Sequence, residues 1–236
     1  MLRAIALSDL HGNKEAVKAF LKDVKNRKLN VEHLIIAGDI GTPEDPNRLR
    51  DILEMLRKEG FKIYYVTGNW DISSTTPNEP GIYNMDDTGP ITIDGFQIVG
   101  HGEKFSPYKL KENMPTILVT HYPPYGILDR GFKYTLHRKG SHTGLIKLNY
   151  LIEEYKPFIH IFGHAHKSGG LTLKLNVIKS VFNKISEEFV YIVVGLGPGN
   201  SVSRVAFLGG KGYILSLIHI SEPTRPRLIS YAVFCL

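Results

Sequence analysis

Polar side chains that can bind metal ions follow five short apolar segments of the chain. Each segment is rich in β-branched or aromatic residues and runs directly into a polar cluster. The clusters are Asp9-Leu10-His11, Gly38-Asp39, Gly68-Asn69, His121 and Gly163-His164-Ala165-His166. Each motif alone is common in proteins without a site. Their occurrence together, each at the end of an apolar run, indicates one site.

The mixture of carboxylate, amide and imidazole groups is typical of a divalent metal site. These ligands favour Zn, Fe, Mn, Ni or Co over Ca, and the clusters contain no thiolate. In D-x-H and H-x-H the two ligands are two residues apart, so they point to the same side of an extended chain. The set is too large for one tetrahedral ion. It fits two ions about 3.5–4 Å apart, bridged by one carboxylate.

The segments that position these clusters alternate between expected strands and expected helices. The apolar runs predict strands at 3–8, 33–38, 62–68, 116–121 and 158–164. Strands that alternate with helices favour α/β units with buried, largely parallel strands, and sites in such sheets lie beyond the carboxyl ends of the strands. Further strands are expected around 91–99, 171–179, 189–195 and 203–208, in an antiparallel or sandwich-like arrangement because no helix separates the last two.

Three helices are expected from apolar residues at helical spacing. The first covers Val17 to Val24 after Asn13, and the second covers Leu49 to Leu56 after Asp45-Pro46, with Gly60 as a stop. The third covers Leu148 to Tyr155, with Ser141 or Thr143 as the cap and Pro157 after its end. All three follow or precede the apolar runs, as α/β units require.

The series DLHG, GD, GN, TH and GHAH resembles the calcineurin-like metallophosphoesterases, over roughly residues 3–210. The resemblance implies an α/β fold, a four-layer αββα sandwich with mixed sheets. It also implies hydrolysis of phosphate esters by a metal-bridging hydroxide. Carried over by position, it assigns one metal to Asp9, His11 and His166, a second to Asn69, His121 and His164, and the bridge to Asp39. Asp39 and Asn69 thereby become catalytic candidates as well as ligands.

Trp70 departs from the family pattern. Many members read GNHD or GNHE here, and that His is taken to protonate the leaving oxygen; this chain reads Gly68-Asn69-Trp70-Asp71. An indole N–H is far too weak an acid to replace it. Three alternatives follow: good leaving groups, another proton donor, or metals that serve binding only. Trp70 itself either stacks on a substrate base or aryl group or packs on the 72–90 loop.

A replacement donor is expected after His121. Residues 121–144 resemble the HxPPxG…HxG pattern of the small, Icc-related members of the family. His142 is the first candidate for proton donor or substrate contact, and Arg138 is a candidate for substrate binding, because both precede a helix start that favours phosphate. The alternative is an ordinary surface loop. His101 is a second candidate donor.

Two further polar residues near the apolar runs are expected to have structural roles. Asp71 follows the GN motif, and we expect it to orient a turn or a ligand. His160 lies inside the run FIHIFGH, and we expect it to be a hydrogen-bonded core residue.

The overall composition limits the classes of protein to which this chain can belong. The chain has 236 residues, 42% of them hydrophobic, with a formal net charge of +6 and a single Cys235. No stretch approaches the roughly 20 apolar residues of a membrane-spanning helix, and one cysteine excludes an internal disulfide framework. These signs favour the cytoplasm and no membrane partner. The positive charge indicates either attraction of anionic substrates or a Lys-rich surface.

Residues 214–236 read ILSLIHISEPTRPRLISYAVFCL and have no helical period. They resemble the conceptual translation of a sequencing-library adapter. We therefore expect a single domain over 1–213 and a non-native tail over 214–236, in which Cys235 and His219 have no function. The alternative is a native C-terminal hairpin.

The leading hypothesis is a two-metal phosphoesterase that hydrolyses a small phosphorylated substrate, more specifically a phosphodiester. The motifs GDIGTPEDP and GNWD differ from those of the Ser/Thr phosphatases and DNA-repair nucleases of this fold. The alternative is a metal-dependent binding or regulatory module of the same fold. A third, weaker hypothesis is a nuclease, which the positive net charge suggests.

Overall fold

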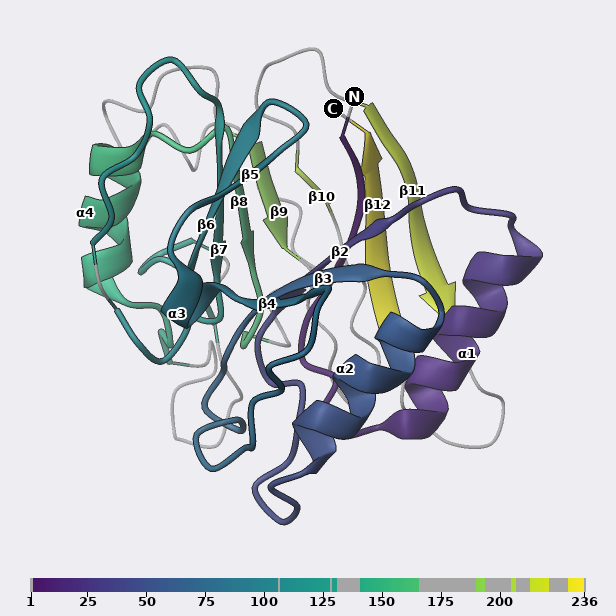
Figure 1. Ribbon diagram of the computed structural model, residues 1–236. Coiled ribbons are helices and arrows are strands. Elements are labelled where there is room, and N and C mark those ends of the chain that lie inside the picture. Colours follow the sequence, from purple (N-terminus) through teal and green to yellow (C-terminus); the bar gives the residue numbers. More distant parts are fainter. Residues whose placement is uncertain are drawn as a thin grey trace.

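The computed structural model describes residues 2–105, 107–127, 129–130 and 141–165, and the backbone of four later strands at 190–193, 205–206, 213–220 and 229–235. The elements form four layers (Figure 1). Two six-stranded sheets lie face to face in the middle, helices α1 and α2 cover one outer face, and α4 covers the other. The expected αββα sandwich with mixed sheets is confirmed.

The first sheet has the order β11-β12-β1-β2-β3-β4. Its parallel strands are β1 (Arg3–Leu7), β2 (His33–Ala37), β3 (Lys62–Val66) and β4 (Ile82–Asn84). Four of the five residues of β1, β2 and β3 are buried in each strand, because helices cover one face and the second sheet covers the other. Their carboxyl ends, which carry the first three polar clusters, therefore lie side by side.

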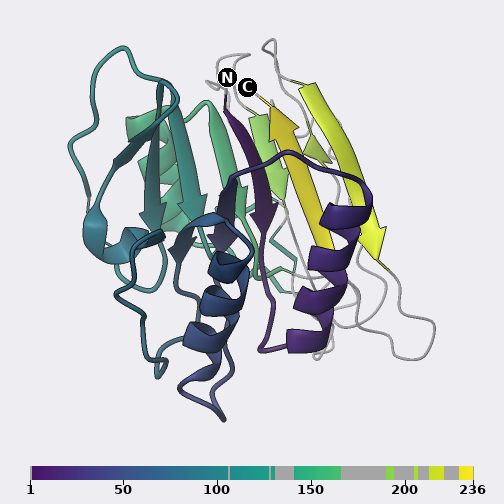
Figure 2. The ribbon, with the colours of Figure 1, turned by 45° about the vertical axis from the view of Figure 1, so that its right-hand side comes forward.

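Helices α1 (Lys14–Asn26) and α2 (Arg48–Lys58) cover the outer face of the first sheet, and a turned view brings them to the front (Figure 2). The Asn13 side chain caps α1 by accepting from the Ala16 N–H at 3.1 Å. The apolar stripes of both helices pack with Ile5, Leu34 and Ile63 of the strands into one core. Surface pairs such as Lys25 with Glu59 join the ends of the two helices at 2.6 Å.

The second sheet has the order β10-β9-β8-β7-β6-β5. Its strands are β5 (Ile91–Ile93), β6 (Phe96–His101), β7 (Thr116–Thr120), β8 (Ile159–Phe162), β9 (Val190–Val193) and β10 (Val205–Ala206). Strands β6 to β9 are parallel, and β9 and β10 pair antiparallel, as expected. Helix α4 (Ile146–Tyr155) connects β7 to β8 and begins at the carboxyl edge of the sheet.

Two predicted helix starts were wrong. Helix α2 begins after Asn47 rather than at Asp45-Pro46, because Asp45 instead forms a turn in which its carboxylate accepts from the Asn47 N–H at 3.1 Å. Helix α4 begins after Leu145, which is extended, rather than at Ser141 or Thr143. Thr143 is engaged elsewhere, since its N–H donates to the Asp129 carbonyl at 2.8 Å. The strand expected at 171–179 lies outside the described residues.

The C-terminal segment supplies two strands, β11 (Tyr213–Ile220) and β12 (Ile229–Cys235). They pair antiparallel with each other, and β12 pairs antiparallel with β1. This arrangement corresponds to the alternative of a C-terminal hairpin. The origin of residues 214–236 and the domain limit at 213 stay predictions. Within the described part of the chain, no helix is long and apolar enough to cross a bilayer.

Candidate metal centre

The expected ligands sit on turns with an unusual backbone. Asp9, His11, Asp39 and His164 have φ values of 54°, 47°, 52° and 67°. This left-handed region is unfavourable for most L residues and is concentrated at functional sites. All four follow buried strands directly. Each turn therefore bends sharply at the strand end and directs its ligand toward the same edge.

Hydrogen bonds tie the turns to one another. The N–H of Asp9 donates to the Gly38 carbonyl at 3.0 Å, and the N–H of His11 donates to the Asp39 carbonyl at 2.8 Å. The N–H of His164 donates to both carboxylate oxygens of Asp9 at 3.1 Å, which joins the second sheet to the first. Asp9 also accepts from the Ser8 hydroxyl. These bonds place clusters that are far apart in sequence at one edge.

The first group of ligand atoms surrounds Asn69. Its Oδ1 lies 3.0 Å from His121 Nε2 and 3.1 Å from His164 Nδ1, and the two ring nitrogens are 3.2 Å apart. His121 Nδ1 lies 3.0 Å from the Ala37 carbonyl, so this nitrogen carries the proton and Nε2 carries a lone pair. The lone pair on His121 Nε2 faces the lone pairs of the Asn69 amide oxygen, and these repel each other unless a cation lies between them. The donor set therefore fits a divalent ion.

The second group lies on the first sheet. Asp9 Oδ1 is 3.9 Å from His11 Nε2, and Asp39 Oδ2 is 3.9 Å from His11 Nδ1. Asp39 also belongs to the first group, where its Oδ1 lies 3.4 Å from His121 Nε2. Ligand atoms of Asp9, His11 and Asp39, and likewise of Asp39, His121 and His164, lie within 4.8 Å of one another. Asp39 is therefore shared. His166 lies outside the described residues.

Electrostatics at Asp39 favour a cation too. Burial raises the pKa of its carboxyl to about 7, and repulsion by Asp9 adds to the rise, whereas His121 and the backbone N–H of Trp70 lower it. Two buried carboxylates side by side repel each other, and a bound cation relieves both the repulsion and the desolvation.

Asp71 holds two of the turns together. This buried carboxylate accepts from the N–H groups of Ile40, Gly41 and Gly68 at 3.1, 2.7 and 3.0 Å. It thereby fixes the turn that carries Asp39 against the turn that carries Asn69. The expected orienting role of Asp71 agrees with these contacts.

A family model described as calcineurin-like phosphoesterase matches residues 2–168 of the 236 in the chain. The chain belongs to this family. The family hydrolyses phosphate esters with divalent metals, and both groups built above lie within the matched range. The resemblance read from the motifs is confirmed, and the match ends before strand β9.

Solved structures of similar shape include TT1561 of Thermus thermophilus. It is 16% identical, with a TM-score of 0.49 over 69% of this chain and 81% of that chain. The purple acid phosphatase PPD1 from yellow lupin seeds is 13% identical, with a TM-score of 0.43 over 70% of this chain and 38% of that chain. A search among curated proteins gave no match.

Trp70 packs against His11, one of the expected ligands. Its indole meets the His11 ring edge-on, with centroids 4.3 Å apart, and its backbone N–H donates to Asp39 Oδ1 at 2.9 Å. The residue remains 38% exposed. It therefore contacts His11 on one side while part of it faces solvent.

Tyr122 is a residue of the site that the sequence reasoning missed. Its ring lies 4.6 Å from the His164 ring and 5.1 Å from the His121 ring, centroid to centroid. Its hydroxyl donates to Glu103 at 2.9 Å. The ring fixes the rotation of two expected ligands. The one available signal was its position directly after His121.

His142 is paired with a buried carboxylate. Its Nδ1 lies 2.8 Å from both oxygens of Asp129, and its ring lies 4.7 Å from the ring of Tyr125. Sequence reasoning named His142 but not Asp129. Arg138, the expected substrate contact, lies outside the described residues.

His101 is in the core and cannot contact substrate. It is 2% exposed and stacks against Phe105 and Tyr108 at centroid distances of 4.7 and 5.4 Å. Burial lowers its pKa to about 4. The expectation that His101 could donate a proton was wrong, because apolar burial keeps it neutral. His160, as expected, is a core residue, with Nε2 2.9 Å from the Thr120 hydroxyl.

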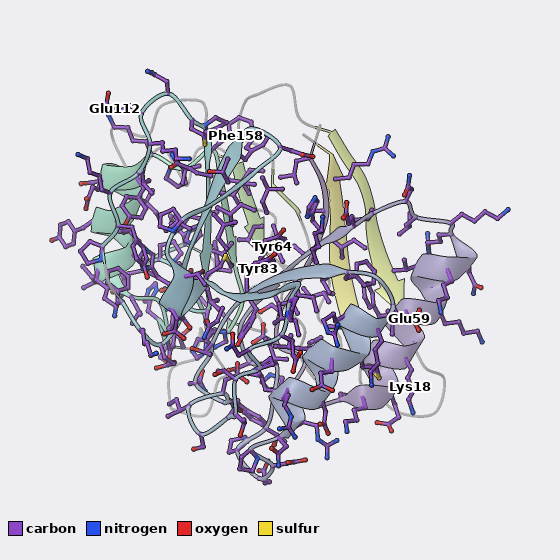
Figure 3. All side chains as sticks on the ribbon, viewed as in Figure 1. Lys18, Glu59, Tyr64, Tyr83, Glu112 and Phe158 are labelled. Carbon is purple, nitrogen blue, oxygen red and sulfur yellow. The ribbon has the colours of Figure 1, made fainter. Side chains whose placement is uncertain are left out.

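A cleft beside the second sheet lies away from the candidate metal centre. It has a volume of about 540 Å3, and Glu112 and Phe158 are among the residues that line it. Both lie at the end of the molecule where the strands begin (Figure 3). The ligands follow the opposite, carboxyl ends of the strands. Chemistry rather than cavity size therefore identifies the site.

Proposed function

We propose that this phosphoesterase hydrolyses phosphodiesters of small phosphorylated substrates with two divalent ions, Mn, Fe, Zn, Ni or Co. The observation that supports this proposal is the sharing of Asp39 between two groups of ligand atoms. Asp9 and His11, with His166, would hold one ion, and Asn69, His121 and His164 would hold the other. Ions at such a site activate water as a nucleophile and neutralise charge on the phosphate.

The residues of this chain have separate tasks in the proposal. Asp39 spans both groups and sets their separation, while the backbone N–H of Trp70 and the His121 ring hold its Oδ1 in place. Asp71 keeps the turns of Asp39 and Asn69 in register. Because both turns are held before substrate arrives, little reorganisation accompanies the reaction.

The preference for diesters is supported by Trp70. The indole occupies the position after Asn69 and supplies no acidic proton, so this position is free to contact the organic part of the substrate instead. Its exposed part offers a flat apolar face for a base or aryl group. Arg138 completes the proposal as an anion contact for the phosphate.

The test is hydrolysis of bis(4-nitrophenyl) phosphate by metal-stripped protein to which Mn²⁺ is added back. We expect turnover that requires the metal and falls at least about 1,000-fold in Asp39→Ala. Glu112→Ala is the matched control, because it removes an exposed carboxylate at the far end of the second sheet. It should keep full activity.

A metal-dependent binding module is the second candidate. The observation that favours it is the packing of Trp70 on His11, where a proton donor would otherwise have room. Protein that holds both ions and turns over no phosphodiester would support this alternative and would contradict the phosphoesterase proposal.

A further inference from the structure

His142 and Asp129 form a fixed pair outside the metal groups. The carboxylate can only accept, so the proton between the two residues belongs to His142 Nδ1, and Nε2 is the second nitrogen of the ring. Asp129 is 1% exposed and also accepts from the Gly126 N–H at 2.9 Å. Its carbonyl accepts from the Thr143 N–H and hydroxyl at 2.8 and 2.9 Å. Hydrogen bonds from Gly126 on one side and Thr143 on the other therefore hold Asp129 in place.

The pair lies at the same edge of the sheet as the ligands. The segment that leaves His121 runs beside the segment that enters α4: the Leu145 N–H donates to the Pro123 carbonyl at 3.0 Å. A Cβ on Gly144 would lie 2.6 Å from the Pro124 carbonyl oxygen, so only glycine allows this close pairing. Helix α4 starts at the carboxyl edge of the second sheet (Figure 1). His142 therefore lies in the connection that leaves His121 and enters α4 at this edge of the sheet.

Two residues of the described site are unsuited to donate a proton to the leaving group. His121 Nδ1 donates to a backbone carbonyl, and its Nε2 belongs to the cluster around Asn69. The residue after Asn69 is Trp70, whose indole is not acidic. The His142 imidazole, in contrast, is 29% exposed, while its partner carboxylate is buried. A buried carboxylate that orients an accessible imidazole is a general acid–base arrangement.

We propose that His142 protonates the leaving oxygen and that Asp129 is its positioning residue. This inference rests on the proposed function. Water-derived hydroxide forms the new P–O bond, the P–O bond to the leaving group breaks, and its electron pair stays on the leaving oxygen. That oxygen takes the proton from Nε2 of the imidazolium. His142 becomes neutral, keeps Nδ1–H donated to Asp129, and regains a proton from solvent.

The test compares two substrates that differ only in the leaving group. Methyl 4-nitrophenyl phosphate releases 4-nitrophenolate, which is a stable anion and leaves without being protonated. Methyl phenyl phosphate releases a phenol with a pKa similar to that of tyrosine, about 10, and gains from protonation. With the Mn²⁺-loaded full chain, we expect His142→Gln to lower kcat for the phenyl ester about 100-fold and kcat for the nitrophenyl ester less than about threefold. Asp129→Asn should show the same selectivity at about tenfold.

Asn149→Ala is the matched control, because it loosens the same loop by removing the bond from Asn149 Nδ2 to the Tyr125 carbonyl at 3.1 Å. It should leave the ratio of the two kcat values unchanged. Equal losses on both esters in His142→Gln, or no loss on either, would overturn the inference while leaving the phosphoesterase intact. Failure of the wild-type protein to cleave even the nitrophenyl ester would overturn the proposed function itself. Should Asp129→Asn not fold, His142→Gln alone decides.

Discussion

Two pairs of histidines in the second sheet differ sharply in their surroundings. His121 and His164 follow strands β7 and β8, and their ring nitrogens lie 3.2 Å apart beside an amide oxygen. His101 is the last residue of β6, and His160 lies within β8 shortly before His164; both are buried on the side of the sheet that α4 covers. Burial lowers the pKa of His101 to about 4 and that of His160 to about 3.

The difference teaches that position along the strand, rather than residue type, decides the role. Side chains inside a strand alternate between the two faces, so His101 and His160 enter the apolar layer under α4. Beyond the strand end the chain turns, and the imidazoles of His121 and His164 lie beside the Asn69 amide oxygen instead of apolar side chains. At β8 and the turn after it, a few residues separate the core group His160 from the candidate ligand His164.

The largest effect that would sharpen this comparison is expected from His121→Ala. It removes a ligand of the group around Asn69, so turnover should fall about 1,000-fold and the metal content should fall. His160→Leu should keep the metal content and instead change stability by about 1 kcal/mol, because Thr120 loses one hydrogen bond and keeps its bond to the Tyr122 carbonyl. Elemental analysis beside bis(4-nitrophenyl) phosphate turnover checks both. Metal loss in His160→Leu would break the comparison.

The next effect concerns acid stability. A His101 pKa lowered from 6.5 to about 4 means that the unfolded chain takes up a proton that the folded chain refuses. The contribution of neutral His101 to the free energy of unfolding is fully present above pH 6.5. About 3 kcal/mol of it is lost as the pH falls toward 4. His101→Phe should remove this loss, since the ring stack with Phe105 and Tyr108 accepts a phenyl group. Urea unfolding at pH 7 and pH 4.5 measures it, and equal slopes against pH in both proteins would contradict the assignment.

A smaller effect is expected at the junction of the two sheets. A Cβ on Gly163 would lie 1.7 Å from Ser8 Oγ and 2.4 Å from Asp9 Oδ2. Gly163→Ala should therefore push Asp9 from the His164 N–H and lower stability by roughly 1–3 kcal/mol, with loss of metal affinity. Adding Ser8→Ala removes the nearest obstacle and should restore part of both. Unchanged metal affinity in the single variant would show that the junction is not needed.

Tyr122 should give a minor effect. Tyr122→Phe keeps the ring against His121 and His164 and removes only the bond to Glu103, so stability should change by about 1 kcal/mol and kcat by less than about threefold. Tyr122→Ala, which removes the ring, is the informative partner. It should lower metal affinity, as isothermal titration with Mn²⁺ would measure. Equal affinities in the two variants would exclude an orienting role for the ring.

The smallest expected effect is none. Deletion of residues 214–236 should leave the metal content unchanged, because both ligand groups come from residues 9–164. Elemental analysis of the shortened chain tests this. Loss of metal would show that β12, which pairs with β1, supports the turn that carries Asp9, and would favour the native hairpin over the adapter interpretation.

The sequence predicted much of this centre because strand ends carry simple signals. Apolar runs that end in Asp9, Asp39, Asn69, His121 and His164 sufficed to place each ligand at a sheet edge. Other features depend on tertiary contacts that no local pattern encodes. The burial of His101 requires three aromatic rings, two from the segment after β6 and one from α4, and His142 and Asp129 are 13 positions apart in the sequence. The start of α4 at Ile146 likewise followed from Thr143 bonding to Asp129.

The bond from the His164 N–H to Asp9 joins residues 155 positions apart. During synthesis at about 5–20 residues per second, Asp9 precedes His164 by roughly 8 to 30 s. In that interval β1, β2 and β3 can pair with one another, whereas Asp9 still lacks the His164 N–H. The described core under α1 and α2 lies within residues 5–82, whereas β12, which also contacts α1, is made later. The early part of this core can therefore consolidate while synthesis continues. The strands and helices that carry Asp9 and Asp39 can therefore fold before the candidate metal centre is complete, and the turn that carries His164 joins them afterwards.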